Sequence, residues 1–340
     1  MKQYRLRQEG DELRIAECEA PLPVPGPGEV VVRMRAASLN YRDLLVLRGS
    51  SGSGGGEEVI PLSDGSGEIV EVGTGVVGFR QGDRVAACFF PDWEDGPFDL
   101  RYHRKALGGS VDGVLTEFAV FPASALVEAP PHLSFEEAAC LPCAAVTAWH
   151  GLVERGGLAA GETVLVLGTG GVAIFALQIA VARGARVIVT SRSQAKLERA
   201  LELGAWTGVA VGERPDWDRA VWDLTDKRGV DHVVEVGGPG TLGRSLNCLG
   251  AEGRIALIGV LTGKGPPDAS LFPLLARNAR IDGIYVGSRA MFERMNDFLT
   301  QHAIHPAIDR VFGFGEAAEA YAHLTSGGHI GKVVIRFEET

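Results

Sequence analysis

A glycine-rich turn between an apolar strand and an apolar helix constrains this chain more than any other feature of its sequence. The run Thr163–Leu167 leads directly into Gly168-x-Gly170-Gly171-x-Ala173, and a helix-forming run follows. This is the G-x-G-x-x-G/A pattern in the strand–turn–helix context that dinucleotide binding requires. Gly168 permits the tight turn, Gly170 lets the backbone approach a pyrophosphate, and Ala173 keeps the helix close to the strand. Because the N–H groups at a helix start attract phosphates, we assign to a dinucleotide Gly168, Thr169, Gly170, Gly171 and Val172.

The same segment carries no charge from Thr163 to Ala182, which is about the length of a membrane-spanning helix. Gly168, Gly170 and Gly171 lie in its middle and would break such a helix into two short pieces. We therefore interpret the segment as a buried strand, a turn and a buried helix.

Apolar strands alternate with helices through the middle of the chain. The expected strands are Thr163–Leu167, Arg186–Thr190, Thr207–Val211, Asp231–Val236, Arg254–Gly259 and Arg280–Val286. The expected helices are Gly171–Arg183, Gln194–Leu203, Trp217–Lys227, Gly240–Leu249 and Ser270–Ala276. Six apolar strands with helical crossovers predict a doubly wound parallel sheet that is covered on both faces. A methyltransferase would share the glycines, but the count of six parallel strands argues against one.

The end of the second strand bears on which dinucleotide binds. NAD-binding proteins usually carry Asp or Glu there, which holds the ribose hydroxyls. This chain has Ser191 followed by Arg192, with Lys196 one helical turn on. A carboxylate would repel a 2′-phosphate, whereas these side chains would bind it through charge-assisted hydrogen bonds. The alternative is a solvated polar turn; we favour NADP(H).

The N-terminal part has a different pattern. Residues 1–125 show short strands between turns, at Glu29–Ala36, Gly67–Val72, Arg84–Phe89 and Leu115–Phe121, which is compatible with a small β-barrel. A long irregular loop spans Pro91–Gly113, and the low-complexity stretch Gly49–Gly56 is expected to be a mobile surface loop. A helix is expected over Phe135–Val153, opened by Ser134 with Glu137 three residues on, as in a capping box.

The C-terminal part completes the predicted organisation. It has a helix over Met291–Gln301, another around Glu316–Leu324 and a last strand, Lys332–Phe337. These elements lack a core of their own, so we expect them to return to the first domain. The predicted boundaries are residues 1–146 for the first domain, 147–286 for the dinucleotide-binding domain and 287–340 for the returning tail.

Composition excludes several classes of function. Lys and Arg number 33 against 43 Asp and Glu, a formal charge of −10, so no basic field favours nucleic acid or an anionic membrane. Five cysteines, an odd number, do not form a disulfide framework, and the N-terminus has no apolar signal segment. We therefore expect a cytoplasmic protein. The spacing Cys140-x-x-Cys143 is that of a redox pair, but no thioredoxin-like context surrounds it.

Several further motifs are shared with one family. They are Ser38-Leu39-Asn40-Tyr41-Arg42-Asp43, Asp64-x-x-Gly67, Gly82-Asp83-Arg84-Val85, Leu141-Pro142-Cys143, Gly229-Val230-Asp231, Gly253-Arg254-Ile255 and Gly331-Lys332. With the glycine turn, they make the whole chain resemble the medium-chain dehydrogenase/reductase superfamily, which includes zinc alcohol dehydrogenases and zinc-free quinone oxidoreductases. The resemblance implies a GroES-like barrel, a Rossmann domain, an active site in the cleft between them, and a homodimer joined through the sixth Rossmann strand.

The resemblance also implies roles for particular residues. Further cofactor contacts fall on Gly237, Ile258, Val260, Val286 and Lys332. Candidate catalytic residues are Asn40, Tyr41, Asp43, Cys143 and Thr147. Asn40 would polarise a substrate oxygen and Tyr41 would donate a hydrogen bond or a proton, although a buried polar turn is the alternative explanation, above all for Asp43. Three aromatic residues, Phe89, Phe90 and Trp93, are candidates for an apolar substrate pocket, with loop packing as their alternative.

The chain differs from the zinc enzymes of this family at the residues that would bind the metal. The three places of the catalytic zinc ligands fall on Asn40, Ser63 and Cys143, with Asp64 where those enzymes usually have Glu, and the loop 91–113 contains no cysteine for a structural zinc. One soft ligand does not hold a zinc that needs three. We expect a metal-free, NADPH-dependent reductase of an activated, carbonyl-bearing acceptor such as an enone or a quinone. The alternatives are an NADP-dependent alcohol dehydrogenase or carbonyl reductase, and a non-catalytic NADPH-binding protein.

Overall fold

The contacts of the chain divide it into two units. The computed structural model describes residues 1–9, 12–49, 58–212, 214 and 216–338. Met1–Val146 and Gly287–Thr340 form one unit, which we call the terminal unit, and Thr147–Val286 form the other, the central unit. The predicted loop Gly49–Gly56 lies, apart from Gly49, outside the described residues.

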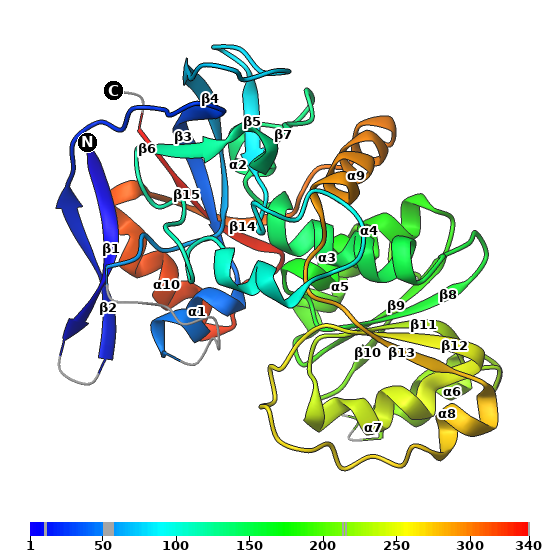
Figure 1. Ribbon diagram of the computed structural model, residues 1–340. Helices are drawn as coiled ribbons and strands as arrows, with labels where there is room; N and C mark the ends of the chain where they lie inside the picture. Colours follow the sequence, from blue (N-terminus) through cyan, green and yellow to red (C-terminus); the bar gives the residue numbers. More distant parts are fainter. Residues whose placement is uncertain (10–11, 50–57, 213, 215, 339–340) are drawn as a thin grey trace. The chain divides into compact units, whose positions relative to one another are not determined.

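The central unit is built on one parallel sheet (Figure 1). Its strands are β8 (Thr163–Leu167), β9 (Arg186–Ser191), β10 (Thr207–Ala210), β11 (Val230–Glu235), β12 (Leu249–Leu257) and β13 (Arg280–Gly283). They lie in the order β10-β9-β8-β11-β12-β13, and every adjacent pair is parallel. The predicted six-stranded, doubly wound sheet is confirmed, and the sixth strand lies at its edge. Four of the predicted strands agree with the structure to within one residue at each end, whereas β12 begins at Leu249 instead of Arg254 and β13 ends at Gly283 instead of Val286.

Helices cover this sheet. They are α3 (Val146–Trp149, which starts at the last residue of the terminal unit), α4 (Gly171–Ala182), α5 (Gln194–Glu202), α6 (Trp217–Leu224), α7 (Pro239–Cys248) and α8 (Phe272–Arg277). In Figure 1, α4 lies on one side of the sheet, and α6, α7 and α8 lie on the other. Trp217 and Val221 of α6 and Leu246 of α7 join the strand side chains in one buried core. β8 is buried along its whole length, as a strand covered on both faces must be.

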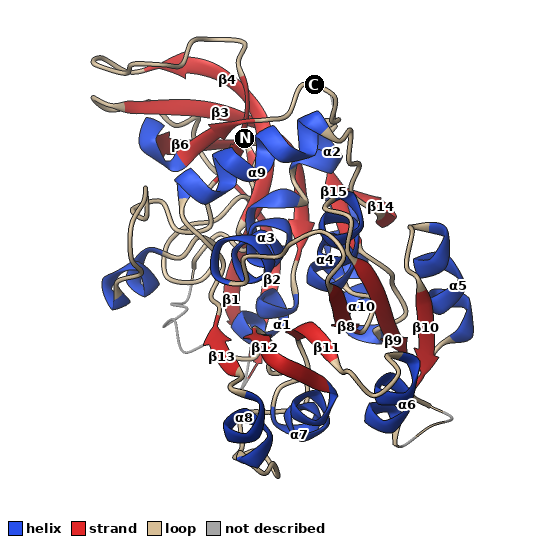
Figure 2. Cartoon of the chain, turned by 90° about the vertical axis from the view of Figure 1, so that its right-hand side faces the viewer, coloured by secondary structure: helices blue, strands red, loops and turns tan. Residues whose placement is uncertain are grey.

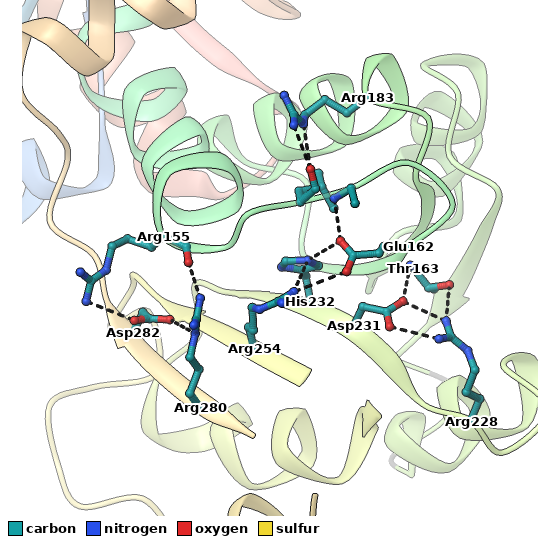
Figure 3. A network of polar contacts seen from close by, with 12 residues as sticks. Arg155, Glu162, Thr163, Arg183, Arg228, Asp231, His232, Arg254, Arg280 and Asp282 are labelled. Carbon is teal, nitrogen blue, oxygen red and sulfur yellow. Dashed lines mark hydrogen bonds and ion pairs between the residues drawn. The ribbon is translucent and has the colours of Figure 1, made fainter. Parts of the chain in front are cut away.

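Charged side chains hold the amino ends of the central strands (Figure 3). Glu162, just before β8, accepts from His232 at 2.9 Å and from Arg254 at 3.4 Å. Arg228 pairs with Asp231 at 2.9 Å. Burial lowers the pKa of His232 below its usual value, against the opposing effect of Glu162. This network lies at the edge of the sheet opposite the glycine turn.

The terminal unit is mostly β. Its strands are β1 (Lys2–Glu9), β2 (Glu12–Glu19), β3 (Glu29–Leu39), β4 (Asp64–Val72), β5 (Arg84–Ala87), β6 (Phe118–Pro122), β7 (Leu126–Glu128), β14 (Ile308–Gly313) and β15 (Lys332–Arg336). β1 and β2 pair as a hairpin, and the others form a sheet of order β14-β15-β3-β4-β5-β7 with β6 on β3. Figure 2 shows β3 and β4 as long neighbouring strands. The C-terminal strands β14 and β15 thus complete the sheet of the N-terminal region.

The terminal unit also contains short helices. They are α1 (Tyr41–Leu47), α2 (Phe135–Ala138), α9 (Arg289–Gln301), α10 (Ala317–Ser326) and the 3₁₀ segments Leu100–Lys105, Ala123–Ala125 and Phe314–Glu316. The strands β1, β2, β7 and β14 and the helix α1 were not predicted from the sequence. No helix among the described residues is long and apolar enough to cross a membrane.

The predicted helix over Phe135–Val153 begins with the expected capping box of Ser134 and Glu137, but it is interrupted and irregular. The structure has α2, then a π-helical turn over Leu141–Ala145, then α3, then a second π-helical segment over His150–Arg155. Pro142 lacks an N–H and its ring crowds the preceding turn, so a regular α-helix does not pass through it.

Candidate active site

The residues assigned to a dinucleotide meet at the carboxyl edge of the central sheet. Gly168 follows β8, Ser191 ends β9, Gly237 follows β11, and Ile258 and Val260 follow β12. The strand order reverses between β8 and β11, because the chain proceeds from β8 to β9 on one side and returns with β11 on the other. Ligands of open α/β sheets bind at such a switch point, outside the carboxyl ends of the strands.

The glycine turn has the backbone that its sequence predicts. Gly168 has φ +76°, a left-handed conformation, and its N–H donates to the Thr190 carbonyl at 3.0 Å. A Cβ on Gly168 or on Gly170 would meet no atom within 4 Å, so the space beside the turn is open. Gly170 is the N-cap of α4, and that helix start presents its free N–H groups beside the open space.

The end of β9 leads into α5 through a polar turn. Ser191 is buried, and its Oγ accepts from the Ser193 N–H at 3.2 Å. Ser193 is the N-cap of α5 and accepts from the Lys196 N–H. Arg192 is exposed between them. Ser191 therefore shapes the turn, and the exposed guanidinium of Arg192 is available at its tip.

Sequence reasoning missed Glu235, the last residue of β11. Its side chain is completely buried, and its Oε1 accepts from the N–H groups of Gly237 (2.7 Å) and Gly238 (2.9 Å) and from the Thr241 hydroxyl (2.7 Å). Ser245 donates to the other oxygen. Four neutral donors thus fix the turn that carries Gly237. A glutamate two residues before the Gly-Gly pair at the end of an apolar strand was the available signal.

Val286 has an unusual backbone conformation. Its φ is +53°, which is strained for a β-branched residue, and its carbonyl accepts from His150 Nδ1 at 2.7 Å. Burial lowers the pKa of His150. Val286 is the last residue of the central unit, three residues beyond β13. Thr147, the catalytic candidate of this unit, is buried in α3.

The catalytic candidates of the terminal unit gather around one buried ammonium. Lys332, the first residue of β15, is 2% exposed, and its Nζ donates to the Leu39 carbonyl (2.9 Å), to Asn40 Oδ1 (2.5 Å) and to Asp64 Oδ2 (3.5 Å). An ammonium has three N–H groups, and these three acceptors match them. The family resemblance predicts a cofactor contact for Lys332, and in the structure its three N–H groups all have acceptors inside the terminal unit.

Asp64 connects this ammonium to Ser63 and Cys143. Its side chain is completely buried, its Oδ1 accepts from the Ser63 hydroxyl at 2.7 Å, and its Oδ2 also accepts from the Cys143 N–H at 3.2 Å. The carboxylate therefore ties β4 to the π-helical turn that carries Cys143 and to β15. Asp64, Cys143 and Lys332 are far apart along the chain, so only the folded structure brings them together.

Asn40 carries a free donor in this cluster. It follows β3 and is the N-cap of α1. Its Oδ1 is bound by Lys332, whereas its Nδ2 is buried with no hydrogen-bond partner in the described part of the chain. A buried donor without a partner costs free energy, about 1–3 kcal/mol, so it is usually retained for a reason. The amide of Asn40 is chemically suited to bind an oxygen atom of a ligand.

Tyr41 and Asp43 lie on the helix that Asn40 opens. Tyr41 is the first residue of α1 and is 36% exposed. Asp43 is 1% exposed, and its Oδ2 accepts from the Asn40 N–H at 2.7 Å. Burial raises the pKa of Asp43 to about 6, although the guanidinium of Arg42 opposes the shift. Asp43 thus holds the backbone that presents Asn40, which supports the structural explanation of this residue.

The aromatic candidates form a cluster inside the loop after β5. Phe89, Phe90 and Trp93 are each at most 2% exposed. The ring centroids of Phe89 and Phe90 are 4.7 Å apart, and Trp93 stacks on Tyr102 at 5.8 Å. The Trp93 indole N–H donates to the Gly96 carbonyl at 3.0 Å. These contacts support packing of the loop, the alternative to a substrate pocket.

The cysteine pair does not have the chemistry of a redox site. Cys140 is fully buried, and burial raises its pKa to about 12. Burial also raises the pKa of the Cys143 thiol. A reactive dithiol needs a stabilised thiolate at an accessible position. Neither thiol is in a disulfide; Cys140 is buried and Cys143 is half-buried.

The residues at the zinc-ligand places do not fit a zinc ion. Asn40 Oδ1 accepts from an ammonium, and the Ser63 hydroxyl donates to Asp64, so neither group is an available anionic or soft donor. Only Cys143 has the required chemistry. Among the residues that the structure describes, no group of three or more His, Cys, Asp or Glu side chains is placed to hold a metal ion.

Two family models match the chain. Residues 26–131 match the alcohol dehydrogenase GroES-like domain, and residues 171–301 match the zinc-binding dehydrogenase domain. The second range contains none of the three zinc-ligand places. A zinc-type alcohol dehydrogenase-like protein of Schizosaccharomyces pombe is 47% identical and covers 96% of both chains. An acryloyl-coenzyme A reductase of Metallosphaera sedula is 32% identical over 96% of this chain and 97% of its own.

Solved structures agree with these relatives. The crystal structure of a protein from Sinorhizobium meliloti that is described as an alcohol dehydrogenase has 44% sequence identity to this chain and a TM-score of 0.92. The match covers 99% of this chain and 98% of that one. An NAD-dependent alcohol dehydrogenase is 32% identical, with a TM-score of 0.87 and 99% of both chains covered. A Rossmann-like sheet with its glycine turn, joined to a GroES-like unit, defines a class of nicotinamide-dependent oxidoreductases. The chain belongs to the medium-chain dehydrogenase/reductase superfamily, with the alcohol dehydrogenase-like proteins as relatives.

Proposed function

We propose that the protein is a metal-free, NADPH-dependent reductase that delivers hydride to a conjugated C=C bond of an enone or to a quinone. The observation that carries this proposal is Asn40 Nδ2, a buried donor with no partner among the described residues. When bound, NADPH supplies the hydride. Asn40 would donate to the carbonyl oxygen of the acceptor, where negative charge develops as hydride reaches the β-carbon. In an enone the α-carbon then takes a proton from Tyr41 or from solvent, and in a quinone the negatively charged oxygen takes it, which gives the hydroquinone.

The choice of an activated acceptor follows from the strength of the donor. A zinc ion polarises a carbonyl as a Lewis acid, and a neutral amide does so less strongly. A conjugated acceptor spreads the developing charge and needs less polarisation than an isolated ketone. The acryloyl-coenzyme A reductase of Metallosphaera sedula, whose named substrate has a conjugated C=C bond, is a relative consistent with this chemistry.

NADPH is proposed because the end of β9 lacks the carboxylate that would repel a 2′-phosphate. Ser191 and exposed Arg192 occupy that place, with Lys196 in the first turn of α5. Arg192 would pair with the phosphate through charge-assisted hydrogen bonds. The NAD-dependent relative makes the cofactor a necessary test. Similar dissociation constants for NADPH and NADH, measured by calorimetry, would contradict this part of the proposal.

The central experiment is the consumption of NADPH with enones, quinones, aldehydes and saturated ketones. We expect conjugated acceptors to be reduced faster than saturated carbonyl compounds. The second candidate is an alcohol dehydrogenase or carbonyl reductase, which the alcohol dehydrogenase relatives favour. Turnover restricted to aldehydes and ketones would establish that candidate, and no NADPH consumption with any acceptor would indicate a binding protein.

Metal independence has a separate test. We expect turnover to survive exhaustive chelation, and the purified protein to contain no stoichiometric zinc by mass spectrometry. Replacing Cys143 by Ser should leave turnover nearly unchanged, because no metal depends on its sulfur. Activity that is lost on chelation and regained with zinc would overturn the metal-free mechanism.

We also propose that two copies associate through the edge of the central sheet. β13 is the edge strand, and its free backbone groups invite a partner. The preceding helix α8 exposes apolar side chains, with Leu271 64%, Phe272 68% and Leu275 77% exposed. Exposed apolar groups gathered in one segment mark an interaction surface. A light-scattering mass of 36.0 kDa, that of one chain, at micromolar concentration would contradict the homodimer.

A further inference from the structure

The orientation of the Asn40 amide is fixed by its neighbour. An ammonium only donates hydrogen bonds, so the amide atom 2.5 Å from Lys332 Nζ must be the oxygen. The nitrogen then points away from Lys332, where it is buried and has no partner among the described residues. We propose that Lys332 is a positioning residue, whose ammonium locks the Asn40 amide with its N–H groups directed to the substrate oxygen. This inference rests on the proposed function, in which Asn40 is the donor.

The backbone makes the lock rigid. Gly331 has φ +68°, and a Cβ on it would lie 2.1 Å from the Ala307 carbonyl oxygen. Only glycine fits there, and the Lys332 N–H donates to the same carbonyl at 2.9 Å. The side chain of Lys332 is therefore directed from a fixed point at the start of β15. Its buried stem and three acceptors leave the ammonium no alternative position.

Removing the ammonium would release the amide. The Leu39 carbonyl and Asp64 Oδ2 would both lose the ammonium, and Asp64 Oδ2 would keep only the Cys143 N–H as a donor, which leaves buried acceptor capacity unused at an unfavourable cost. The –NH2 group of Asn40 could replace the lost ammonium as a donor to these acceptors. The amide would then favour the inverted orientation, in which Nδ2 takes the place of Oδ1. In that orientation Oδ1 faces the substrate oxygen and repels it. The active orientation thus depends on a residue that does not touch the substrate.

The first experiment is a double-mutant cycle on the two residues. We expect Lys332→Met to lower kcat by roughly tenfold to a hundredfold, the factor that corresponds to one charged hydrogen bond. The NADPH dissociation constant should stay unchanged. Combining Lys332→Met with Asn40→Ala should lower kcat no further than Asn40→Ala alone, because the lock has no purpose without the amide. Additive losses, or weaker NADPH binding, would overturn the proposal.

The second experiment separates positioning from folding. Lys332→Ala leaves a space at the ammonium site, so added propylammonium should restore part of kcat, whereas Lys332→Met fills the space and should not respond. A second control, Lys332→Met with Asp64→Asn, removes both charges of the buried pair. This double variant should fold but keep the low kcat. Recovery of kcat in that variant would show that Lys332 acts only by balancing Asp64.

A third measurement needs no activity. Neutron diffraction from deuterated crystals distinguishes the amide nitrogen from the oxygen. The deuterated –ND2 group of Asn40 should point away from Lys332 in the parent protein and should be inverted, or present in both orientations, in Lys332→Met. An unchanged amide in Lys332→Met would refute the lock even if the reductase activity is confirmed. A correct lock in a protein that reduces no enone or quinone would instead refute the proposed function alone.

Discussion

Glu235 of the central unit and Asp64 of the terminal unit are both completely buried carboxylates, and their hydrogen-bond donors differ in kind. Glu235 of the central unit binds four neutral donors, all within ten residues of it along the chain. Asp64 of the terminal unit also binds the ammonium of Lys332, 268 residues away. The donors of Glu235 come from one turn and the helix after it, whereas Lys332 reaches Asp64 only when β15 has joined the sheet. Glu235 therefore fixes the local backbone of one turn, and Asp64 is part of a charged cluster that forms only in the folded unit.

The largest expected effect concerns the charged cluster. Asp64→Asn leaves the buried ammonium of Lys332 without its counter-charge, and breaking a buried ion pair from one side costs about 3–5 kcal/mol. Urea denaturation should show this loss in the free energy of unfolding. If Asp64→Asn is as stable as the parent protein, the carboxylate is not the partner on which Lys332 depends.

The next effect concerns catalysis. Asn40→Asp keeps the shape of the side chain and the hydrogen bond from Lys332, but it removes the free donor. Loss of one donor to a developing oxyanion is worth about 2.7–4 kcal/mol, so kcat should fall by roughly a hundredfold or more. Asn40→Ala should show a similar loss. NADPH titrations should give an unchanged dissociation constant, and a large change would mean that the terminal unit also binds the cofactor.

The matching change in the central unit affects binding instead. Arg192→Ala should weaken NADPH by roughly tenfold to a hundredfold, the value of a hydrogen bond to a charged group, and should leave NADH unaffected. Calorimetric titration with both cofactors measures this. Equal losses of affinity for NADPH and NADH would show that Arg192 does not bind the 2′-phosphate. Arg199→Ala, on the exposed surface of α5, is a control that should change the affinity for neither cofactor.

Glu235→Gln tests the local carboxylate. The amide oxygen can keep the three hydrogen bonds of Oε1, but the new –NH2 group then faces the Ser245 hydroxyl, which donates to Oε2 in the parent protein, so we expect a loss of about 1–3 kcal/mol of stability. The loss should be smaller than that of Asp64→Asn because no buried ammonium is left unpaired. Urea denaturation of both variants under the same conditions measures the two stability losses. A larger loss in Glu235→Gln than in Asp64→Asn would contradict the difference between the two carboxylates.

The smallest effects come from acidification, and they have opposite signs in the two units. Burial lowers the pKa of His232 below its ordinary 6.5, so the unfolded chain binds this proton first and stability is lost as pH falls below about 6.5. Asp43 has its pKa raised from 3.8 to about 6, so its contribution is present below 3.8 and is lost as pH rises through 6. Hydrogen exchange at pH 7.5 and 5.5 should show faster opening of β11 at the lower pH, but not of α1. His232→Gln should remove the response of β11.

The fold of the central unit was largely predictable because its elements are encoded by residues that are close together in the sequence. The strand, the glycine turn and the helix from Thr163 to Ala182 follow one another, and the structure has them where the pattern predicts. The six strands were predicted because each is an apolar run of the expected length. The break of the helix at Pro142 was missed because the helical pattern of the flanking residues outweighed one proline.

The terminal unit was less predictable. Asn40 was recognised as a candidate through the family motif, but the sequence does not show that its oxygen is occupied and its nitrogen free. That distinction depends on Lys332, whose ammonium reaches Asn40 only because β15 pairs with β3 in the folded sheet. The sequence leaves packing and a substrate pocket open for the aromatic residues of the loop, and only their ring contacts in the folded structure favour packing.

The sequence by itself determined the parallel sheet, the glycine turn and the chemistry of the residues at the zinc-ligand places, since each depends on residue type and on neighbours along the chain. Tertiary structure alone decided which atoms of those residues remain available. β3, β4 and β15 come from three distant parts of the chain, and their pairing brings Asn40, Asp64 and Lys332 within hydrogen-bonding distance. The orientation of an amide depends on the charge of its neighbour, and in this protein that neighbour is supplied by the last strand.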